Sequence, residues 1–267
     1  MNTRHTFIAA AVTFLCLFVM SSAAGTVSVP NAFYQGYVTY NNSTTVMSGP
    51  GIYSIGPTSG WVWGFPNASM SLDSACSAGP INGCGTGGAI DLTYYFAVTG
   101  GNVGDPVNVA VDGILRAAMS ANNTGSESES GTYASLTLSA YGNNYPAALG
   151  NFCLGPCSIS QSWAGTLNVP MNSGDIGTID LNIITSLDEG ISGCPGPSCL
   201  LGSGSAFAYA DPYIYIDPST TNAGLYGIVV SQGIGNSPLA TPEPSSLVLL
   251  GSGLVGLAGV VRRKMIG

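Results

Sequence analysis

Apolar side chains recur at every second position in many short segments of this chain, and this alternation limits its fold more than any other feature. In residues 106–112, three valines stand at alternate positions with Asn, Ala and Asp between them. Residues 132–141 and 179–183 have the same period of two. A helix would scatter such residues around its surface, whereas a strand points them to one face. Gly, Pro, Asn and Asp fill the intervening stretches, as is typical of turns between antiparallel strands.

Ten to eleven strands can be counted in this way, at residues 33–40, 51–55, 61–65, 90–98, 106–112, 132–141, 163–169, 179–183, 206–210, 213–217 and 225–230. Between the two ends of the chain, only residues 114–120 have helix character, and residues 122–130 are typical of a loop. Because one face of each strand is apolar and crossover helices are absent, the sequence predicts an all-β fold. We expect an antiparallel β-sandwich of jelly-roll-like type.

The first residues have the pattern of an export signal. Arg4 supplies a positive start, residues 7–20 are mostly apolar, and small residues allow cleavage after Ala24. We therefore expect residues 1–24 to be a helical signal peptide that signal peptidase removes. The sandwich domain is then expected to span residues 25–236.

Removal of the signal peptide would take Cys16 with it and leave six cysteines. Export would place these six in an oxidising compartment. They fall in three close pairs separated by long gaps: Cys76 and Cys84, Cys153 and Cys157, Cys194 and Cys199. Six cysteines allow 15 pairings, and the grouping favours one disulfide within each close pair. A zinc site is the alternative, but this region contains neither a histidine nor a C-x-x-C pair to support it.

The chain ends in a short linker and three further features. The linker, residues 237–241, precedes Pro242, Glu243 and Pro244. An apolar run then spans residues 247–261, and as a helix it would be ~22 Å long, shorter than the ~30 Å hydrocarbon core of a bilayer. Long basic side chains can snorkel to the headgroups, so we expect a transmembrane helix here with its basic end in the cytoplasm. That basic cluster is Arg262, Arg263 and Lys264.

These features, in this order, resemble the PEP-CTERM sorting signal, which here would cover residues 242–267 with Pro242, Glu243 and Pro244 as its motif. The resemblance implies that an exosortase-like membrane enzyme cuts near the motif and releases or transfers the protein at the cell surface. It also implies a role alongside exopolysaccharide in biofilm or floc formation. An ordinary C-terminal membrane anchor is the alternative interpretation.

The balance of charge excludes one class of function. Of the five basic residues, only Arg116 lies outside the two ends of the chain. It stands against twelve carboxylates, which are the thirteen acidic residues less Glu243. So acidic a domain cannot bind nucleic acid by neutralising phosphates.

Catalysis has few candidates in this sequence. The single histidine is His5 in the signal peptide, so Ser-His-Asp, Cys-His and histidine-zinc hydrolases lack their imidazole. A glycosidase needs two carboxyl groups about 5 to 9.5 Å apart, and the candidates are Asp188 with Glu189 and Asp211 with Asp217. Asp188 and Glu189 are expected in a loop, and the Asp-Pro steps more simply mark strand ends. We predict no enzyme, no catalytic residue and no metal or cofactor site.

Binding has more support, because aromatic side chains stack on sugar rings. Trp61 and Trp63 are one residue apart and would share one face of a strand. Further aromatic candidates are Tyr94, Tyr95, Tyr213 and Tyr215. Core packing is the alternative for each of them. Loop carboxylates can coordinate calcium, and the candidates for such a site are Asp73, Asp188 and Glu189.

Three functions follow from these observations. The first is an exported structural or adhesive component of the extracellular matrix. The second is a carbohydrate-binding module, with or without calcium, that holds exopolysaccharide. The third is a secreted glycan hydrolase. A solvent-facing aromatic cluster would favour the second, two facing carboxyl groups the third, and the absence of both the first.

Overall fold

The computed structural model describes residues 27–65, 67–77, 84–122, 128–189 and 203–237. The chain divides into two compact units, Met1–Asn236 and Ser237–Gly267, and the sandwich lies in the first. The expected signal helix, the sorting motif, the apolar run and the basic cluster all lie outside the described residues. Within the part that is described, no helix is long and apolar enough to cross a membrane.

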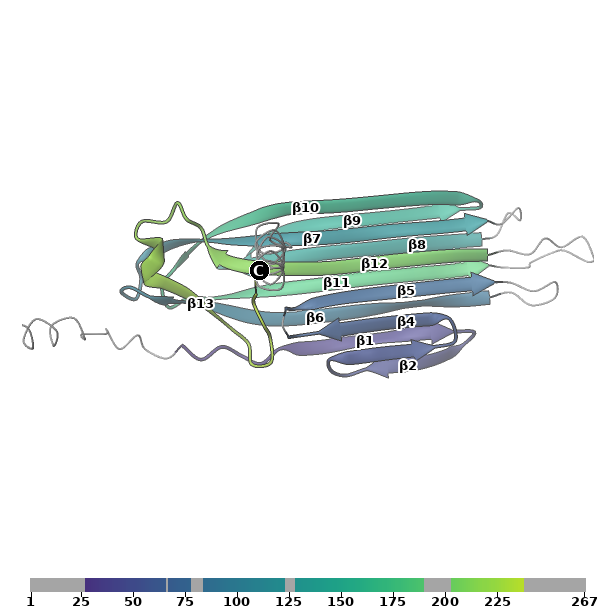
Figure 1. Ribbon diagram of the computed structural model, residues 1–267, viewed down its shortest axis with the longest axis horizontal. Coiled ribbons are helices and arrows are strands. Elements are labelled where there is room, and N and C mark those ends of the chain that lie inside the picture. Colours follow the sequence, from purple (N-terminus) through teal and green to yellow (C-terminus); the bar gives the residue numbers. More distant parts are fainter. Residues whose placement is uncertain (1–26, 66, 78–83, 123–127, 190–202, 238–267) are drawn as a thin grey trace, which may run out of the picture. The chain divides into compact units, whose positions relative to one another are not determined.

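Two antiparallel sheets form the sandwich (Figure 1). The first sheet has the order β2 (Ser43–Met47), β1 (Phe33–Tyr40), β6 (Cys84–Gly100), β11 (Ile176–Glu189), β8 (Ser128–Ala140) and β9 (Asn143–Leu154). The second has the order β10 (Cys157–Asn172), β7 (Pro106–Asn122), β12 (Ser203–Ile216), β5 (Ser69–Ser77), β4 (Thr58–Trp63) and β3 (Gly51–Ile55). A short 3-10 helix, η1 (Ala223–Leu225), leads into β13 (Tyr226–Val230), which pairs with β6. The all-β antiparallel prediction is confirmed.

The eight strands from β5 to β12 pair in a nested order. β8 pairs with β9, β7 with β10, β6 with β11 and β5 with β12. The chain thus folds back on itself once, between β8 and β9. The resulting strand pairs alternate between the sheets: β8–β9 and β6–β11 belong to the first, and β7–β10 and β5–β12 to the second. Nested pairing of eight strands in two sheets is the jelly-roll arrangement. Strands β1 to β4 extend both sheets beyond β6 and β5.

The core lies between the sheets and takes alternate side chains from each strand. In β11, Ile179, Leu181 and Ile183 are buried, while the residues between them point outward. Burial of each such side chain contributes about 1.5–3 kcal/mol to stability. Hydroxyl groups also meet across the core, since Ser74 Oγ lies 2.6 Å from Thr185 Oγ1.

The expected helix at residues 114–120 is wrong, because these residues lie inside β7. Leu115, Ala117 and Met119 point to the core, but Ala118 stands on the outer side, so apolar residues occupy both faces and hide the period of two. β7 pairs with β10 on one side and with β12 on the other. These two ladders outweigh the helix propensity of its alanines.

Other boundaries also differ from expectation. β2, β5 and β9 were not predicted, because Ser, Thr, Asn and Ala make up much of their sequences. Asp188 and Glu189 belong to the end of β11 rather than to a loop. The two strands expected at residues 206–210 and 213–217 are the single strand β12.

β12 runs through Pro212 without a break because its pairing with β5 stops at Ala210. Beyond that point Asn236 replaces β5: the Ile214 N–H donates to Asn236 Oδ1 at 2.9 Å, and Asn236 Nδ2 donates to the Ile214 carbonyl at 2.7 Å. The backbone of Pro212 faces the same edge as that of Ile214. Pro212 has no N–H to donate, and at this edge no neighbouring strand would accept such a hydrogen bond.

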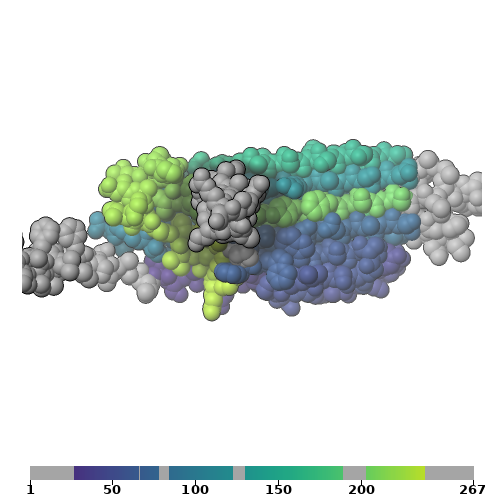
Figure 2. Space-filling view, in the orientation of Figure 1, coloured from purple at the N-terminus to yellow at the C-terminus, as the bar shows by residue number. Residues whose placement is uncertain are grey.

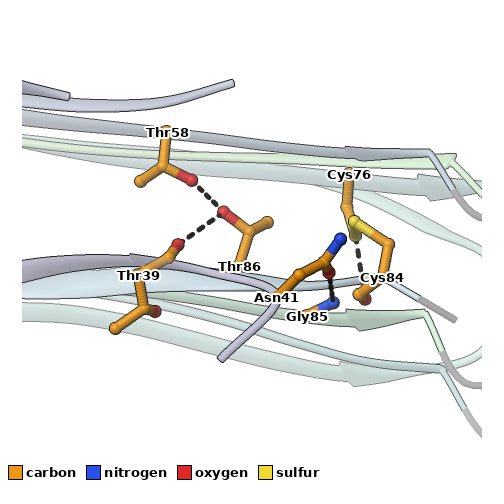
Figure 3. Close-up of a disulfide and its surroundings, with 7 residues drawn as sticks. All are labelled: Thr39, Asn41, Thr58, Cys76, Cys84, Gly85 and Thr86. Carbon is orange, nitrogen blue, oxygen red and sulfur yellow. Dashed lines mark hydrogen bonds between the residues drawn. A yellow bond between two sulfur atoms is a disulfide. The ribbon is translucent and has the colours of Figure 1, made fainter. Parts of the chain in front are cut away.

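Two disulfides connect the sheets at one end of the sandwich, Cys76–Cys84 between β5 and β6 (Figure 3) and Cys153–Cys157 between β9 and β10. Their Cα atoms are 5.8 and 6.5 Å apart, and both pairs agree with the grouping seen in the sequence. The third expected pair, Cys194 and Cys199, lies outside the described residues. It falls between β11 and β12, which also belong to different sheets.

Candidate binding face

Four aromatic side chains stand at alternate positions of β12. Successive side chains of a strand point to opposite faces, and the alanines at 206, 208 and 210 are buried in the core. The aromatic residues therefore share the outer face of the second sheet. Figure 2 shows this face, with β12 as a green band between β7 and β5. The four residues are Phe207, Tyr209, Tyr213 and Tyr215.

Strand register brings the two tryptophans of β4 to the same face. Trp61 lies opposite Ser71 of β5, and Ser71 lies opposite Tyr209 of β12. Because serine is small, the rings of Trp61 and Tyr209 approach edge to face with their centroids 6.2 Å apart. Trp63 follows two residues later and is 41% exposed. We call these two tryptophans and the four aromatic residues of β12 the aromatic face.

Arg116 continues this row on β7, directly opposite Tyr209. Its guanidinium carbon lies 5.8 Å from the centroid of the tyrosine ring, a cation–π contact. It is the only basic residue in the described part of the chain, and it forms no ion pair with a described carboxylate. The exposed guanidinium therefore keeps N–H donors for a ligand.

A buried carboxyl group fixes the orientation of Tyr209. Asp211 is only 8% exposed, and its Oδ2 accepts a 2.8 Å hydrogen bond from the Tyr209 hydroxyl. Its Oδ1 has no hydrogen-bond partner among the described residues. Burial raises the pKa of Asp211, and the bond from Tyr209 opposes that rise only in part. Burial, and then Asp211, raise the pKa of Tyr209, so its hydroxyl stays a donor at neutral pH.

The other two tyrosines form a second stacked patch on β12. The rings of Tyr213 and Tyr215 lie 5.6 Å apart at an interplanar angle of 18°. The Tyr215 hydroxyl donates to Asp112 Oδ1 at 3.3 Å, and Thr166 Oγ1 donates to the same oxygen at 2.5 Å. Polar groups of β7 and β10 thus border the rings.

A hollow of about 370 Å³ adjoins the aromatic face beside Phe207. Serine and alanine side chains of β5, β7, β10 and β12 line much of it. Asp73 stands at its border, and burial raises the pKa of this carboxyl group. The face therefore combines exposed ring surfaces, hydrogen-bonding groups and a shallow hollow, a combination suited to a sugar ring.

The structure brings together only some of the aromatic residues singled out in the sequence. Trp61, Trp63, Tyr213 and Tyr215 share the aromatic face. Tyr94 is buried in the core, so the suggestion that it binds sugar is wrong. Tyr95, its neighbour in β6, points to the outer side of the first sheet. Sequence reasoning missed Phe207, Tyr209 and Arg116, although the aromatic alternation within residues 207–215 could have revealed the first two.

The carboxylates considered for calcium or catalysis are not brought together where their side chains are described. Asp73 points outward from the second sheet and Asp188 from the first, while the side chain of Glu189 lies outside the description. Among the described residues, no group of three His, Cys, Asp or Glu side chains is placed to hold a metal ion. Asp211 and Asp217 are six residues apart along an extended chain, about 20 Å, which exceeds the ~5–9.5 Å of a glycosidase pair.

Comparison with known protein families identifies a PEP-CTERM protein-sorting motif at residues 240–264. The motif implies export, processing by an exosortase-type enzyme, and membrane-associated sorting to the cell surface. It does not extend into the sandwich, which is not assigned to a family. No curated protein matches the chain.

Proposed function

We propose that this protein, once sorted to the cell surface, binds exopolysaccharide of the surrounding matrix through its aromatic face. The sorting motif supports the surface location. One observation carries the binding role: Trp61 and Trp63 lie on the outer side of the second sheet together with the aromatic side chains of β12, rather than in the core.

The chemistry of the face suits sugars. The C–H faces of a sugar ring stack on aromatic rings, and half-buried aromatic side chains bind without losing much conformational freedom. Arg116 adds hydrogen-bond donors at one end of the row, and Asp112 adds acceptor oxygens farther along β7. Sugar hydroxyl groups need both kinds of partner.

This proposal gives a specific chemistry to the structural or adhesive matrix role expected from the sequence. A protein that acted by packing alone would have no need of an exposed aromatic row. Adhesion follows if the sandwich holds polysaccharide at the cell surface. We propose a binding protein rather than a hydrolase, and one that works without calcium, because Asp211 and Asp217 are far apart and Asp73 and Asp188 lie on opposite faces of the sandwich.

Tryptophan fluorescence tests this role directly. The exported protein is titrated with uncharged polysaccharide from the matrix of its host, and we expect a saturable change in emission from Trp61 and Trp63. Replacement of both by alanine removes these reporters, so its affinity is measured by calorimetric titration, and it should weaken this site at least tenfold, or about 1.4 kcal/mol. Phe33→Ala, at an exposed aromatic residue on the other sheet, should leave affinity unchanged. No emission change in the wild-type protein would contradict the proposal.

A further inference from the structure

The outer side of the first sheet carries a second site of a different shape. A groove of about 1140 Å³ crosses β1, β6 and β11, and a hollow of about 370 Å³ continues it over β8 and β9. Both are lined by Ile184 and Ser186, so they form one channel. We call it the cross-strand groove.

Strand register explains why the channel exists. The pairing places Thr39, Gly87, Ser186, Gly131 and Phe152 in one row across five neighbouring strands. Thr39, Gly87, Ser186 and Gly131 are small, so this part of the row leaves a floor that lies below its neighbours. Five strands are separated by four steps of ~4.8 Å, so the row is about 19 Å long. A ligand must therefore be extended and must lie across the strands.

The walls of the groove offer aromatic and polar contacts. Tyr37 is 45% exposed, Tyr133 is 37% exposed, and Phe152 is 64% exposed at the far end. Asn41 and Asp188 border the side nearest the Cys76–Cys84 disulfide, where Asn41 Oδ1 accepts a 3.2 Å hydrogen bond from the Gly85 N–H (Figure 3). By register Tyr37, Ile184 and Tyr133 lie in one row along one side of the floor, and Asn41 and Asp188 lie on the other side.

The sheet around the groove argues against a peptide ligand. Peptides that bind to sheets do so by adding a strand to an edge. β1, β6, β11 and β8 each have a neighbour on both sides, so their backbone groups are already paired, and among the strands of this row only β9, at the far end, is an edge strand. Across those four strands recognition must come from side chains, and those present suit sugar hydroxyl groups and ring faces.

The charge of this face limits which polysaccharides the groove can bind. The ionisable carboxyl side chains described on this outer face are Asp91, Asp180 and Asp188, and no described basic residue lies there. The two nearer the middle of the sheet are held by neighbours, because Asn182 Nδ2 donates to Asp91 Oδ1 and Thr93 Oγ1 donates to Asp180 Oδ1. An anionic polymer would be repelled.

We propose that the cross-strand groove binds an extended, uncharged polysaccharide chain, as a second site independent of the aromatic face. The two sites lie on opposite sides of the sandwich, so one domain can hold two chains at once. This cross-linking role rests on the proposed function of the aromatic face, whereas binding in the groove does not.

Two glycines of the groove allow a clean test. A Cβ added at Gly85 would meet nothing within 4 Å, and at Gly131 the nearest atom would be Phe152 Cδ2 at 3.7 Å. Gly85→Gln with Gly131→Gln should therefore fill the channel without disturbing the sheet. Gly224→Gln is the matched control, because it is also open and lies in η1, outside the groove. Circular dichroism checks that each full-length variant is folded.

The experiment is calorimetric titration with oligosaccharides released from the uncharged matrix polysaccharide. We expect two sites per wild-type chain. One site should remain after Trp61→Ala with Trp63→Ala, one after the double glycine change, and none after all four changes. Only the wild type and the Gly224→Gln variant should raise the viscosity of a solution of the intact polysaccharide.

Each failure has a distinct signature. Unchanged stoichiometry in the glycine double variant would overturn the groove proposal, whatever the tryptophan variant shows. Unchanged stoichiometry in the tryptophan variant would instead overturn the role of the aromatic face. Binding of the anionic polysaccharide pool in preference to the uncharged pool would also contradict the proposed ligand of the groove.

Discussion

The hydroxyl of Tyr209 donates a 2.8 Å hydrogen bond to Oδ2 of Asp211, two residues farther along β12. The carboxyl group is almost fully buried, and burial raises its pKa. This buried acid therefore fixes the orientation of Tyr209 within the aromatic face.

This burial predicts how stability depends on pH. The folded protein holds the Asp211 proton more tightly than the unfolded chain, so the contribution of this group is largest at low pH and is lost as pH rises through its raised pKa. Asp211→Asn should remove that loss. Near neutral pH the free energy of unfolding of the variant should therefore be higher than that of the wild-type protein. Urea unfolding at a series of pH values measures it.

Asp217 provides a control of opposite sign. It lies just beyond β12 and is partly exposed, and hydrogen bonds from Ser219 lower its pKa. The stability it adds is present at neutral pH and is lost as pH falls through the lowered pKa. Asp217→Asn should therefore never stabilise the protein at neutral pH. The same sign for both variants would contradict the assignment.

The disulfides should stabilise the end of the sandwich by measurable amounts. Loop closure predicts that Cys76→Ser with Cys84→Ser lowers the free energy of unfolding by about 2–3 kcal/mol, and that the shorter loop of Cys153–Cys157 contributes about 2 kcal/mol. Denaturant unfolding of oxidised protein tests both. Non-reducing peptide mapping should also recover Cys194 linked to Cys199, and a free thiol at either position would refute that pairing.

Asn236 should stabilise the exposed edge of β12. Asn236→Ala removes two hydrogen bonds to the backbone of Ile214 and leaves those groups unpaired, at a cost of about 1–3 kcal/mol. Asn168→Ala, at an exposed position on β10, should cost no more than about 0.5 kcal/mol. Equal effects would show that water satisfies this edge equally well.

Sorting can be tested by intact mass. We expect the native protein to lose the segment that follows Pro244, and Glu243→Ala to retain it in the membrane fraction. Retention of the complete tail in both proteins would show that the segment acts as a plain anchor.

Periodicity predicted the fold well where one face of a strand is apolar, as in residues 179–183. It failed in β7, where Ala118 places an apolar side chain outside, and in β5 and β9, whose small polar residues resemble a loop. The exposed row of Trp61 and Tyr209 could not be predicted, because register between strands far apart in the chain depends on packing. The groove could not be predicted for the same reason, because Gly87 and Gly131 come into one row only after β6, β11 and β8 have paired.

The nested pairing of β5 with β12 has a kinetic consequence. Ser77 is opposite Ser203, so the outermost pair of the wrap joins parts of the chain that are separated by most of the domain. Such high contact order predicts slow folding that can finish only when β12 has crossed the membrane. The sorting motif follows soon afterwards, at residue 240. We expect protease resistance to arise in pulse-labelled cells while the tail is still attached. The membrane would then retain the chain until its slow folding is complete.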